Sequence, residues 1–212
     1  MFVVEKYNYI SSSIHALSSK TTLVVVTKNQ DVDKINSLIN LNHIDFGENR
    51  VQEATQKWKS LILNNSKLRL HLIGKLQSNK AKDAFELFDY IHTLDNEKLA
   101  KIFSKMQSNS LRKIKYFIQV NIANEPQKNG MTIDTTNEFI KYCINDLKLN
   151  VIGLMCIPPI DVDPTQYFKK LSEIARLNNL SELSMGMSSD YACAIKNGAT
   201  FVRVGSRIFS EN

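Results

Sequence analysis

Eight short runs rich in β-branched and aromatic residues recur along the chain, and longer helical patterns separate them. The runs cover residues 22–27, 43–46, 69–73, 90–93, 115–121, 151–156, 182–185 and 200–204. Strands that alternate with helices form βαβ units and pair in parallel. The pattern therefore predicts an α/β fold, a single closed (β/α)8 barrel of the TIM type over residues 1–212, with one extra helix in the first twenty residues.

An open doubly wound sheet is the competing architecture, because 212 residues is short for a barrel fold that usually takes ~250. No GxGxxG motif follows the first predicted strand, which weakens the dinucleotide-binding version of that alternative. Two helix starts are also predicted. Asp95 is expected to cap one helix, and Asp163 is expected to cap another that has Pro164 at its first position.

Composition excludes several classes of function. The chain has 27 Lys+Arg against 21 Asp+Glu, but the basic residues are spread along its whole length, so we expect no nucleic-acid partner. No apolar run approaches the ~20 residues that a membrane-spanning helix needs, so we expect no membrane association. The 3 cysteines lack metal-binding or disulfide spacing and are expected to be buried thiols in a reducing, cytoplasmic compartment.

The four histidines also lack the spacing of metal ligands, and we predict no metal site. His71 and His92 fall on the third and fourth predicted strands. They are expected to be core or rim histidines whose hydrogen bonds are satisfied.

A lysine stands at the end of the first predicted strand, the end at which TIM barrels carry their chemistry. Lys28 directly follows the apolar run Leu23-Val-Val-Val-Thr27. Desolvation at such a position favours the neutral amine, which is the form that condenses with an aldehyde or ketone. The alternative is a lysine that simply extends into solvent.

Small residues follow the seventh and eighth predicted strands, where barrels commonly bind phosphate. Ser188-Ser189-Asp190 is expected to open a helix, and Gly205-Ser206 precedes a final turn. Unpaired N–H groups at such positions bind anions, although ordinary N-capping is the alternative for the serine pair. Together with Lys28, these loops predict a ligand that carries both a carbonyl and a phosphate. Pyridoxal 5′-phosphate (PLP) and a phosphorylated sugar or keto acid both fit.

Arg203 bears on the choice between these ligands. Alternation on the eighth strand places it on one side with Phe201 and Gly205. If this side faces the barrel interior, the guanidinium reaches the ligand. Opposite a pyridine nitrogen, an always-charged donor keeps that nitrogen unprotonated and the ring a poor electron sink. The alternative is an arginine on the outer surface.

At these residues the chain resembles the pyridoxal phosphate homeostasis proteins, which are single-domain relatives of the alanine racemase N-terminal barrel. The matching segments lie in order along nearly the whole chain: residues 23–28 (LVVVTK), 46–53 (FGENRVQE), 71–80 (HLIGKLQSNK), 119–122 (QVNI), 128–130 (KNG), 153–155 (GLM), 183–190 (LSMGMSSD) and 201–209 (FVRVGSRIF).

The resemblance implies PLP as the cofactor and assigns a role to each site residue. Lys28 would form the Schiff base, and Asn49 would lie beside the ring. Arg203 would face the pyridine nitrogen. The phosphate would be held by Ser188, Gly205 and Ser206. Three residues depart from the family pattern, which has proline at Lys75, threonine at Ser206 and glycine at Ser210. Lys28 is also followed by Asn29-Gln30 instead of standing in the more common Thr-Lys-Pro. The Ser206 hydroxyl preserves a phosphate donor.

The resemblance also implies a carrier that is not an enzyme. In the racemase relatives a second, β-rich domain supplies the tyrosine that acts as the opposite acid–base, and a two-base racemase needs a proton donor on each face of its substrate. With the eighth strand close to Asn212, we expect no such domain here. We therefore expect a cytoplasmic, monomeric protein that holds PLP and delivers it to PLP-dependent apo-enzymes. A weak amino-acid racemase and a Schiff-base aldolase are the alternatives.

Overall fold

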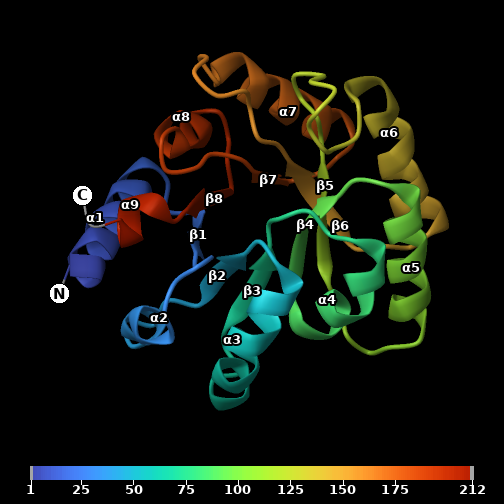
Figure 1. Cartoon of the computed structure of the whole chain (residues 1–212). Helices are drawn as coiled ribbons and strands as arrows, with labels where there is room; N and C mark the ends of the chain where they lie inside the picture. The colour runs from blue at the N-terminus through green and yellow to red at the C-terminus, as the bar shows by residue number, and fades with distance from the viewer. Residues whose placement is uncertain (1, 211–212) are drawn as a thin grey trace.

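Eight parallel strands close into a barrel surrounded by helices, in a computed structural model that describes residues 2–210 (Figure 1). The strands are β1 (Thr22–Val26), β2 (Asp45–Glu48), β3 (Arg69–Leu72), β4 (Tyr90–Leu94), β5 (Lys115–Gln119), β6 (Val151–Met155), β7 (Glu182–Ser184) and β8 (Phe201–Val204). Each pairs with the next along the chain, and β1 pairs with β8, with Val24 opposite Arg203. The predicted (β/α)8 barrel is confirmed.

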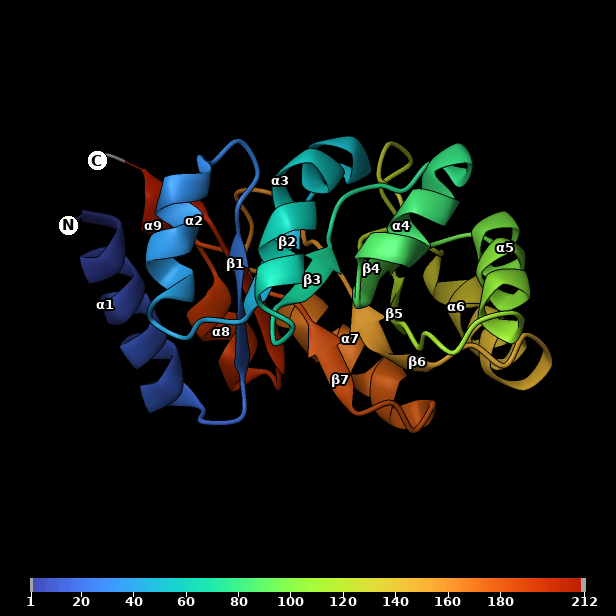
Figure 2. The same ribbon diagram turned by 90° about the horizontal axis from the view of Figure 1, so that it is seen from below.

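The helices form the outer ring, as the turned view shows (Figure 2). They are α1 (Phe2–Leu17), α2 (Val32–Ile39), α3 (Val51–Asn64), α4 (Ala81–Leu87), α5 (Glu97–Ser108), α6 (Ile133–Lys141), α7 (Thr165–Leu177), α8 (Tyr191–Lys196) and α9 (Ser206–Phe209), with a 3₁₀ turn at Ser78–Lys80 and a π-helical turn at Tyr142–Asp146. The extra N-terminal helix, α1, lies beside α9 at the start and end of the described chain.

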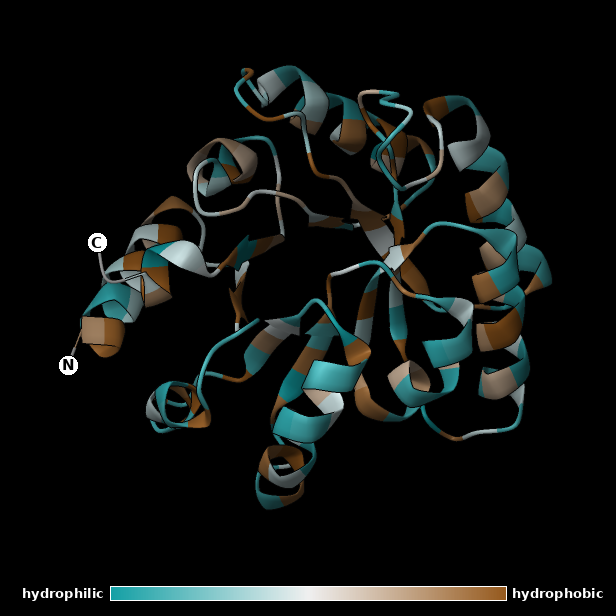
Figure 3. Cartoon of the chain, in the orientation of Figure 1, coloured by the Kyte–Doolittle hydropathy of each residue, from teal (hydrophilic) through white to brown (hydrophobic). Residues whose placement is uncertain are grey.

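Apolar side chains form two separate cores. The larger lies between the strands and the helices, whose outward faces are polar (Figure 3), and it includes the fully buried Trp58 of α3, whose ring lies 4.9 Å from that of Phe46. A smaller cluster fills the barrel itself and consists of Val24, Tyr90, Phe117, Met155 and Phe201. Because Phe201 lies inside the barrel, the face of β8 that carries Phe201 and Arg203 points inward.

Most element boundaries differ from the sequence prediction by one or two residues. The second strand starts at Asp45 and not at residue 43, because the His43 N–H bonds the Leu38 carbonyl in the turn that ends α2. Asn96, and not Asp95, caps α5, since its side chain accepts the Leu99 N–H at 3.0 Å. Helix α7 begins at Thr165 rather than at Pro164.

The cysteines match the expectation of buried thiols only in part. Cys143 and Cys156 are buried, and burial raises the pKa of each thiol to about 12, but Cys193 is half-buried. Within residues 2–210, no helix is long and apolar enough to cross a membrane.

Candidate functional site

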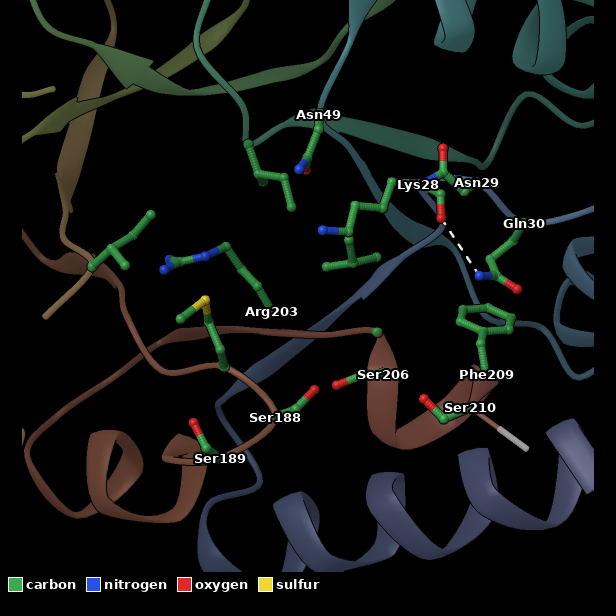
Figure 4. A pocket seen from close by; sticks show the side chains of 15 residues that line it. Lys28, Asn29, Gln30, Asn49, Ser188, Ser189, Arg203, Ser206, Phe209 and Ser210 are labelled. Atoms are coloured by element: carbon green, nitrogen blue, oxygen red, sulfur yellow. Dashed lines mark hydrogen bonds between the residues drawn. The ribbon is translucent and has the colours of Figure 1, made fainter. Parts of the chain in front are cut away.

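A cavity of about 600 Å³ opens at the carboxyl ends of β1, β2 and β8 (Figure 4). All six residues that the sequence singled out line this cavity, and Gly205 does so with its backbone. The lining consists of Val26, Lys28, Asn29, Gln30, Asn49, Ile73, Ile157, Met187, Ser188, Ser189, Arg203, Gly205, Ser206, Phe209 and Ser210. The fold therefore brings together residues from the first and the last strands, because β1 and β8 are neighbours in the closed barrel.

Lys28 extends into the cavity from the loop after β1 (Figure 4). Lys28 is exposed, which matches the alternative of a lysine that extends beyond the strand end and not that of a buried amine. The reason is that β1 ends at Val26 and Thr27 takes the last buried position. Lys28 therefore lies one residue beyond the core, at the wall of an open pocket.

The backbone on both sides of Lys28 is held by charged residues from β2 and α3. Lys57 Nζ donates to the Thr27 carbonyl at 2.8 Å, and the Asn29 N–H donates to Glu53 Oε1 at 2.8 Å. Glu48, fully buried, accepts hydrogen bonds from the Thr27 hydroxyl at 2.7 Å and from Lys57 Nζ at 3.0 Å. We call Glu48, Glu53 and Lys57 the loop clamp, because they fix the chain from which Lys28 projects.

Asn49 follows β2 and is placed by a close backbone contact. A Cβ on Gly74 would lie 2.2 Å from the Asn49 carbonyl oxygen, so only glycine allows this approach. The Asn49 side chain points toward the same space as Lys28 (Figure 4), and its Oδ1 is buried without a hydrogen-bond partner. An unpaired buried amide oxygen is costly unless a ligand satisfies it.

Arg203 enters the cavity from inside the barrel. Its side chain is 4 % exposed, which confirms the inward-facing alternative of the sequence analysis. Nη1 donates to Ser184 Oγ at 2.6 Å and Nη2 donates to the Cys156 carbonyl at 3.0 Å. Burial lowers the pKa of the guanidinium, which still stays charged in proteins. The remaining N–H groups give the cavity a fixed cationic donor.

Ser188 and Ser206 form the opposite wall, with their hydroxyl groups turned toward each other (Figure 4). Gly205 lies between β8 and the short α9, and a Cβ there would lie 2.9 Å from the Val26 carbonyl oxygen. The expected helix after Ser188 begins later, at Tyr191, because Asp190 caps it and accepts the Met187 N–H in the turn. Ser188 therefore lies in a turn before the helix.

The electrostatics of the cavity favour an anion. Two cations, Lys28 and Arg203, line it, and among the described residues of the lining none is acidic. Serine hydroxyls and a glycine backbone on one wall, facing an amine and a guanidinium on the other, are the groups that bind phosphate and carbonyl oxygens.

Comparisons with known proteins agree with this geometry. Residues 6–212 match the family model of the alanine racemase N-terminal domain. A pyridoxal phosphate homeostasis protein of Pasteurella multocida is 35% identical over 201 residues, which cover 90% of this chain and 86% of the relative.

Two solved structures of PipY from Synechococcus elongatus extend the match. The form without PLP superposes with a TM-score of 0.89 at 32% identity and covers 99% of this chain and 100% of its own. The form with PLP bound superposes with a TM-score of 0.87 at 31% identity and covers 98% and 100%.

The chain belongs to the pyridoxal phosphate homeostasis protein family. The family assignment was reached correctly from the sequence motifs, and these motifs coincide with the cavity. Segments 23–28, 46–53, 183–190 and 201–209 all contribute residues to its lining.

The cavity of this family member fits PLP on three observations. The buried Asn49 Oδ1 lacks a partner, the lining is cationic, and an amine projects into the space from Lys28. Pyridoxal phosphate is a phosphorylated aldehyde, so each of these features has a matching group on the cofactor.

Sequence reasoning missed the loop clamp and part of the apolar lining. Glu53 and Lys57 have the i,i+4 spacing of a helical ion pair, which was a detectable signal. Ile157 and Met187 line the cavity from two separate loops and Phe209 lines it from α9, and their meeting could not be read from the sequence because it depends on the closed barrel.

Proposed function

We propose that this chain binds PLP in the cavity at the carboxyl end of the barrel and holds it as a Schiff base on Lys28. One observation carries the proposal: an amine, a guanidinium, an amide side chain and two serine hydroxyls converge on one cavity that has no acidic residue among its described lining. The cofactor supplies an aldehyde, which condenses with a primary amine and releases water.

Each side chain then has a part in holding the cofactor. Ser188 and Ser206, with the backbone at Gly205, bind the phosphate. Asn49 contacts the ring. Arg203 donates to the pyridine nitrogen, and because a guanidinium does not give up its proton at neutral pH, this nitrogen stays unprotonated. The ring is then a weaker electron sink than one paired with a carboxylate, which favours storage of the cofactor over turnover.

We further propose that the protein acts as a carrier that delivers PLP to apo-enzymes, and that it is a monomeric, cytoplasmic, single-domain protein without catalytic turnover. The lining supports the absence of turnover. Among its described residues, Lys28 has the sole amine, and no imidazole, phenol, thiol or carboxyl group lines the cavity. A two-base racemase would need a second proton donor on the opposite face. The exposed position of Lys28, at the wall of an open cavity, is suited to release of the cofactor.

The decisive experiment locates the covalent bond. The purified protein is incubated with PLP, its visible absorbance is recorded, and the adduct is trapped with borohydride and mapped by peptide mass spectrometry. We expect a yellow protein with the modification on Lys28. Lys28→Ala should lose both signals, whereas the exposed Lys59→Ala should keep them. A wild-type protein that stays colourless would refute PLP binding, and an adduct on another lysine would refute the role of Lys28.

Turnover is tested separately. The PLP-loaded protein is mixed with single-enantiomer amino acids in deuterated water, and exchange at Cα is followed by NMR. We expect no repeated exchange. Rapid exchange over many turnovers would establish the racemase alternative. Activity on a phosphorylated sugar in a protein without the yellow colour would instead establish the aldolase.

A further inference from the structure

Five buried polar side chains run in series through the barrel from one end to the other. Arg203 Nη1 lies 2.6 Å from Ser184 Oγ, which lies 2.7 Å from His92 Nδ1. His92 Nε2 lies 2.9 Å from His71 Nδ1, and His71 Nε2 lies 3.0 Å from Asp45 Oδ1. We call this series the interior chain. Its members come from β8, β7, β4, β3 and β2, and each is less than 9 % exposed.

The interior chain connects opposite ends of the barrel. Asp45 is the first residue of β2, and it also pairs with Arg69 at the amino end of β3. Arg203 lines the cavity at the carboxyl end. Within residues 2–210, no group of three potential ligands is arranged to hold a metal ion, so the two histidines serve a hydrogen-bonded path and not a metal centre.

With both imidazoles neutral, the chemistry of the two ends fixes the direction of every hydrogen bond. The Asp45 carboxylate only accepts, so His71 Nε2 carries the hydrogen. In a neutral imidazole Nδ1 is then the acceptor, and His92 Nε2 must donate to it. The same step repeats at His92, whose Nδ1 accepts the Ser184 hydroxyl hydrogen. Ser184 Oγ is left to accept from Arg203, which has donors alone. All four bonds are satisfied in this one arrangement.

Packing supports neutral, fixed imidazoles. The His71 ring is stacked on Tyr90 with centroids 4.3 Å apart, and the His92 ring is stacked on Phe117 at the same separation. Burial lowers the pKa of His71 and lowers that of His92 further below its usual value. Both rings are therefore neutral at pH 7, as the direction of the hydrogen bonds in the interior chain requires.

The interior chain supplies one of the two acceptors that hold the Arg203 guanidinium. No carboxylate forms an ion pair with it among residues 2–210, and its acceptors are the Ser184 hydroxyl and the Cys156 carbonyl. The Ser184 oxygen is a good acceptor because its own hydrogen is committed to His92. Each member of the chain polarises the next, which strengthens the bond at the far end.

We propose that Asp45, His71, His92 and Ser184 are positioning residues that orient the Arg203 guanidinium, so that a carboxylate at the amino end of the barrel sets the donor presented to the ligand at the carboxyl end. For its ligand the inference rests on the proposed PLP binding. The direction of the hydrogen bonds does not depend on it.

The direction is tested without any cofactor. In protein labelled with ¹⁵N-histidine, the nitrogen shifts of His71 and His92 report which ring atom carries hydrogen. We expect both rings to be neutral at pH 7 with hydrogen on Nε2. Hydrogen on Nδ1 of either ring, or a doubly protonated ring, would overturn the proposal. This result stands whether or not PLP binds.

The coupling is tested by a double-mutant cycle on PLP affinity and on the visible absorbance maximum. His71→Phe breaks the interior chain far from the cavity, and Ser184→Ala breaks it beside Arg203. Each alone should weaken binding about 3–10-fold, the worth of one neutral hydrogen bond, and should shift the absorbance maximum. In the Ser184→Ala background His71→Phe should add little, because the path is already cut.

His43→Phe is the matched control. His43 is buried and bonds the Asp45 carbonyl at 2.8 Å, but it lies outside the interior chain. His43→Phe should leave PLP affinity and the absorbance maximum unchanged.

Asp45→Asn is the milder variant if His71→Phe does not fold. It keeps an acceptor for His71 and removes the charge, and it should give a smaller shift in the same direction. Additive effects of His71→Phe and Ser184→Ala, or an equal effect of His43→Phe, would overturn the proposal. A wild-type protein that binds no PLP would refute the proposed function instead, and the tautomer measurement would still decide the direction.

Discussion

Lys57 Nζ lies 3.0 Å from Oε1 of Glu48, a carboxylate with no exposed surface, and the same amine donates to the Thr27 carbonyl beside Lys28. A structural ion pair on α3 and β2 therefore holds the residue that precedes the proposed cofactor lysine. Trp58 Nε1 also donates to Glu48 at 2.9 Å, which ties the pair to the main core.

The loop clamp should be important for stability. Lys57→Met leaves the buried Glu48 charge without its cation, and loss of one partner of a buried pair typically costs about 3–5 kcal/mol. Urea denaturation should register this loss. Lys101→Met, which breaks the exposed pair with Glu97 on α5, is the control and should change the midpoint little. Similar midpoints for both variants would contradict a buried, structural role for Lys57.

Stability should fall in mild acid. Burial lowers the pKa of His43, His71 and His92 below 6.5. Below pH 6.5 the unfolded chain therefore binds protons that the folded chain does not, and the free energy of unfolding decreases as pH falls. At full effect each histidine contributes a slope of about 1.4 kcal/mol per pH unit.

Urea midpoints at pH 7.5 and 5.5 measure this slope. The charged and titratable groups that act on His71 are Asp45, Arg69, Asp89 and His92, and the two carboxylates oppose the effect because their charges raise the pKa of His71. His92→Phe removes one of the titrating rings and should flatten the dependence, while the exposed His15→Gln should not. A wild-type urea midpoint that is the same at both pH values would show that burial does not oppose protonation of these rings.

Gly74→Ala should damage the cofactor site more than the fold. The new Cβ would meet the Asn49 carbonyl oxygen at 2.2 Å, so the backbone at Asn49 must shift, at a cost of about 1–3 kcal/mol for such overpacking. PLP titration should show clearly weaker binding.

Gly198→Ala is the control for this substitution. Gly198 has a φ of +93° in a turn remote from the cavity, and a methyl carbon added there would lie 3.7 Å or more from its nearest side-chain neighbours. The variant should lose stability through backbone strain and keep its affinity for PLP. Unchanged binding in Gly74→Ala would argue against the role of Asn49.

The Ser206 hydroxyl should contribute one hydrogen bond to the charged phosphate of PLP. Ser206→Ala is expected to weaken PLP binding by about 10–100-fold, since such bonds contribute about 1.5–3 kcal/mol. Ser206→Thr keeps the hydroxyl and should bind as the wild type does. Titration with PLP and with pyridoxal, which lacks the phosphate, separates this contact from the others. Ser206→Ala should lose affinity for PLP alone, and an equal loss for pyridoxal would contradict phosphate binding.

The barrel and the cavity residues could be predicted because both depend on local patterns. Apolar β-rich runs gave the strand count, and the carboxyl ends of strands gave Lys28 and the serine loops. Alternation on the eighth strand left Arg203 facing either inward or outward, and the family resemblance assigned the roles of Arg203 and Asn49. The predicted element boundaries were less accurate, because they depend on competition between individual hydrogen bonds. An example is the bond from the His43 N–H to the Leu38 carbonyl in α2.

Contacts between distant strands could not be predicted. His71 and His92 were correctly expected to be satisfied in the core. The partner of His71, Asp45, lies on the neighbouring β2, but Ser184, the partner of His92, lies on β7 across the barrel interior. The exposure of Lys28 was left open between a desolvated amine and a lysine that extends into solvent, because it depends on whether β1 ends one residue earlier or later.

The pairing of β1 with β8 divides the proposed site between the beginning and the end of the chain. During synthesis Lys28 is made early, whereas Arg203, Gly205 and Ser206 follow the other seven strands, so a chain that stops before β8 lacks part of the cavity. Bound PLP would then report that the ring of strands has closed. Its colour could serve as an optical probe of the final step of folding.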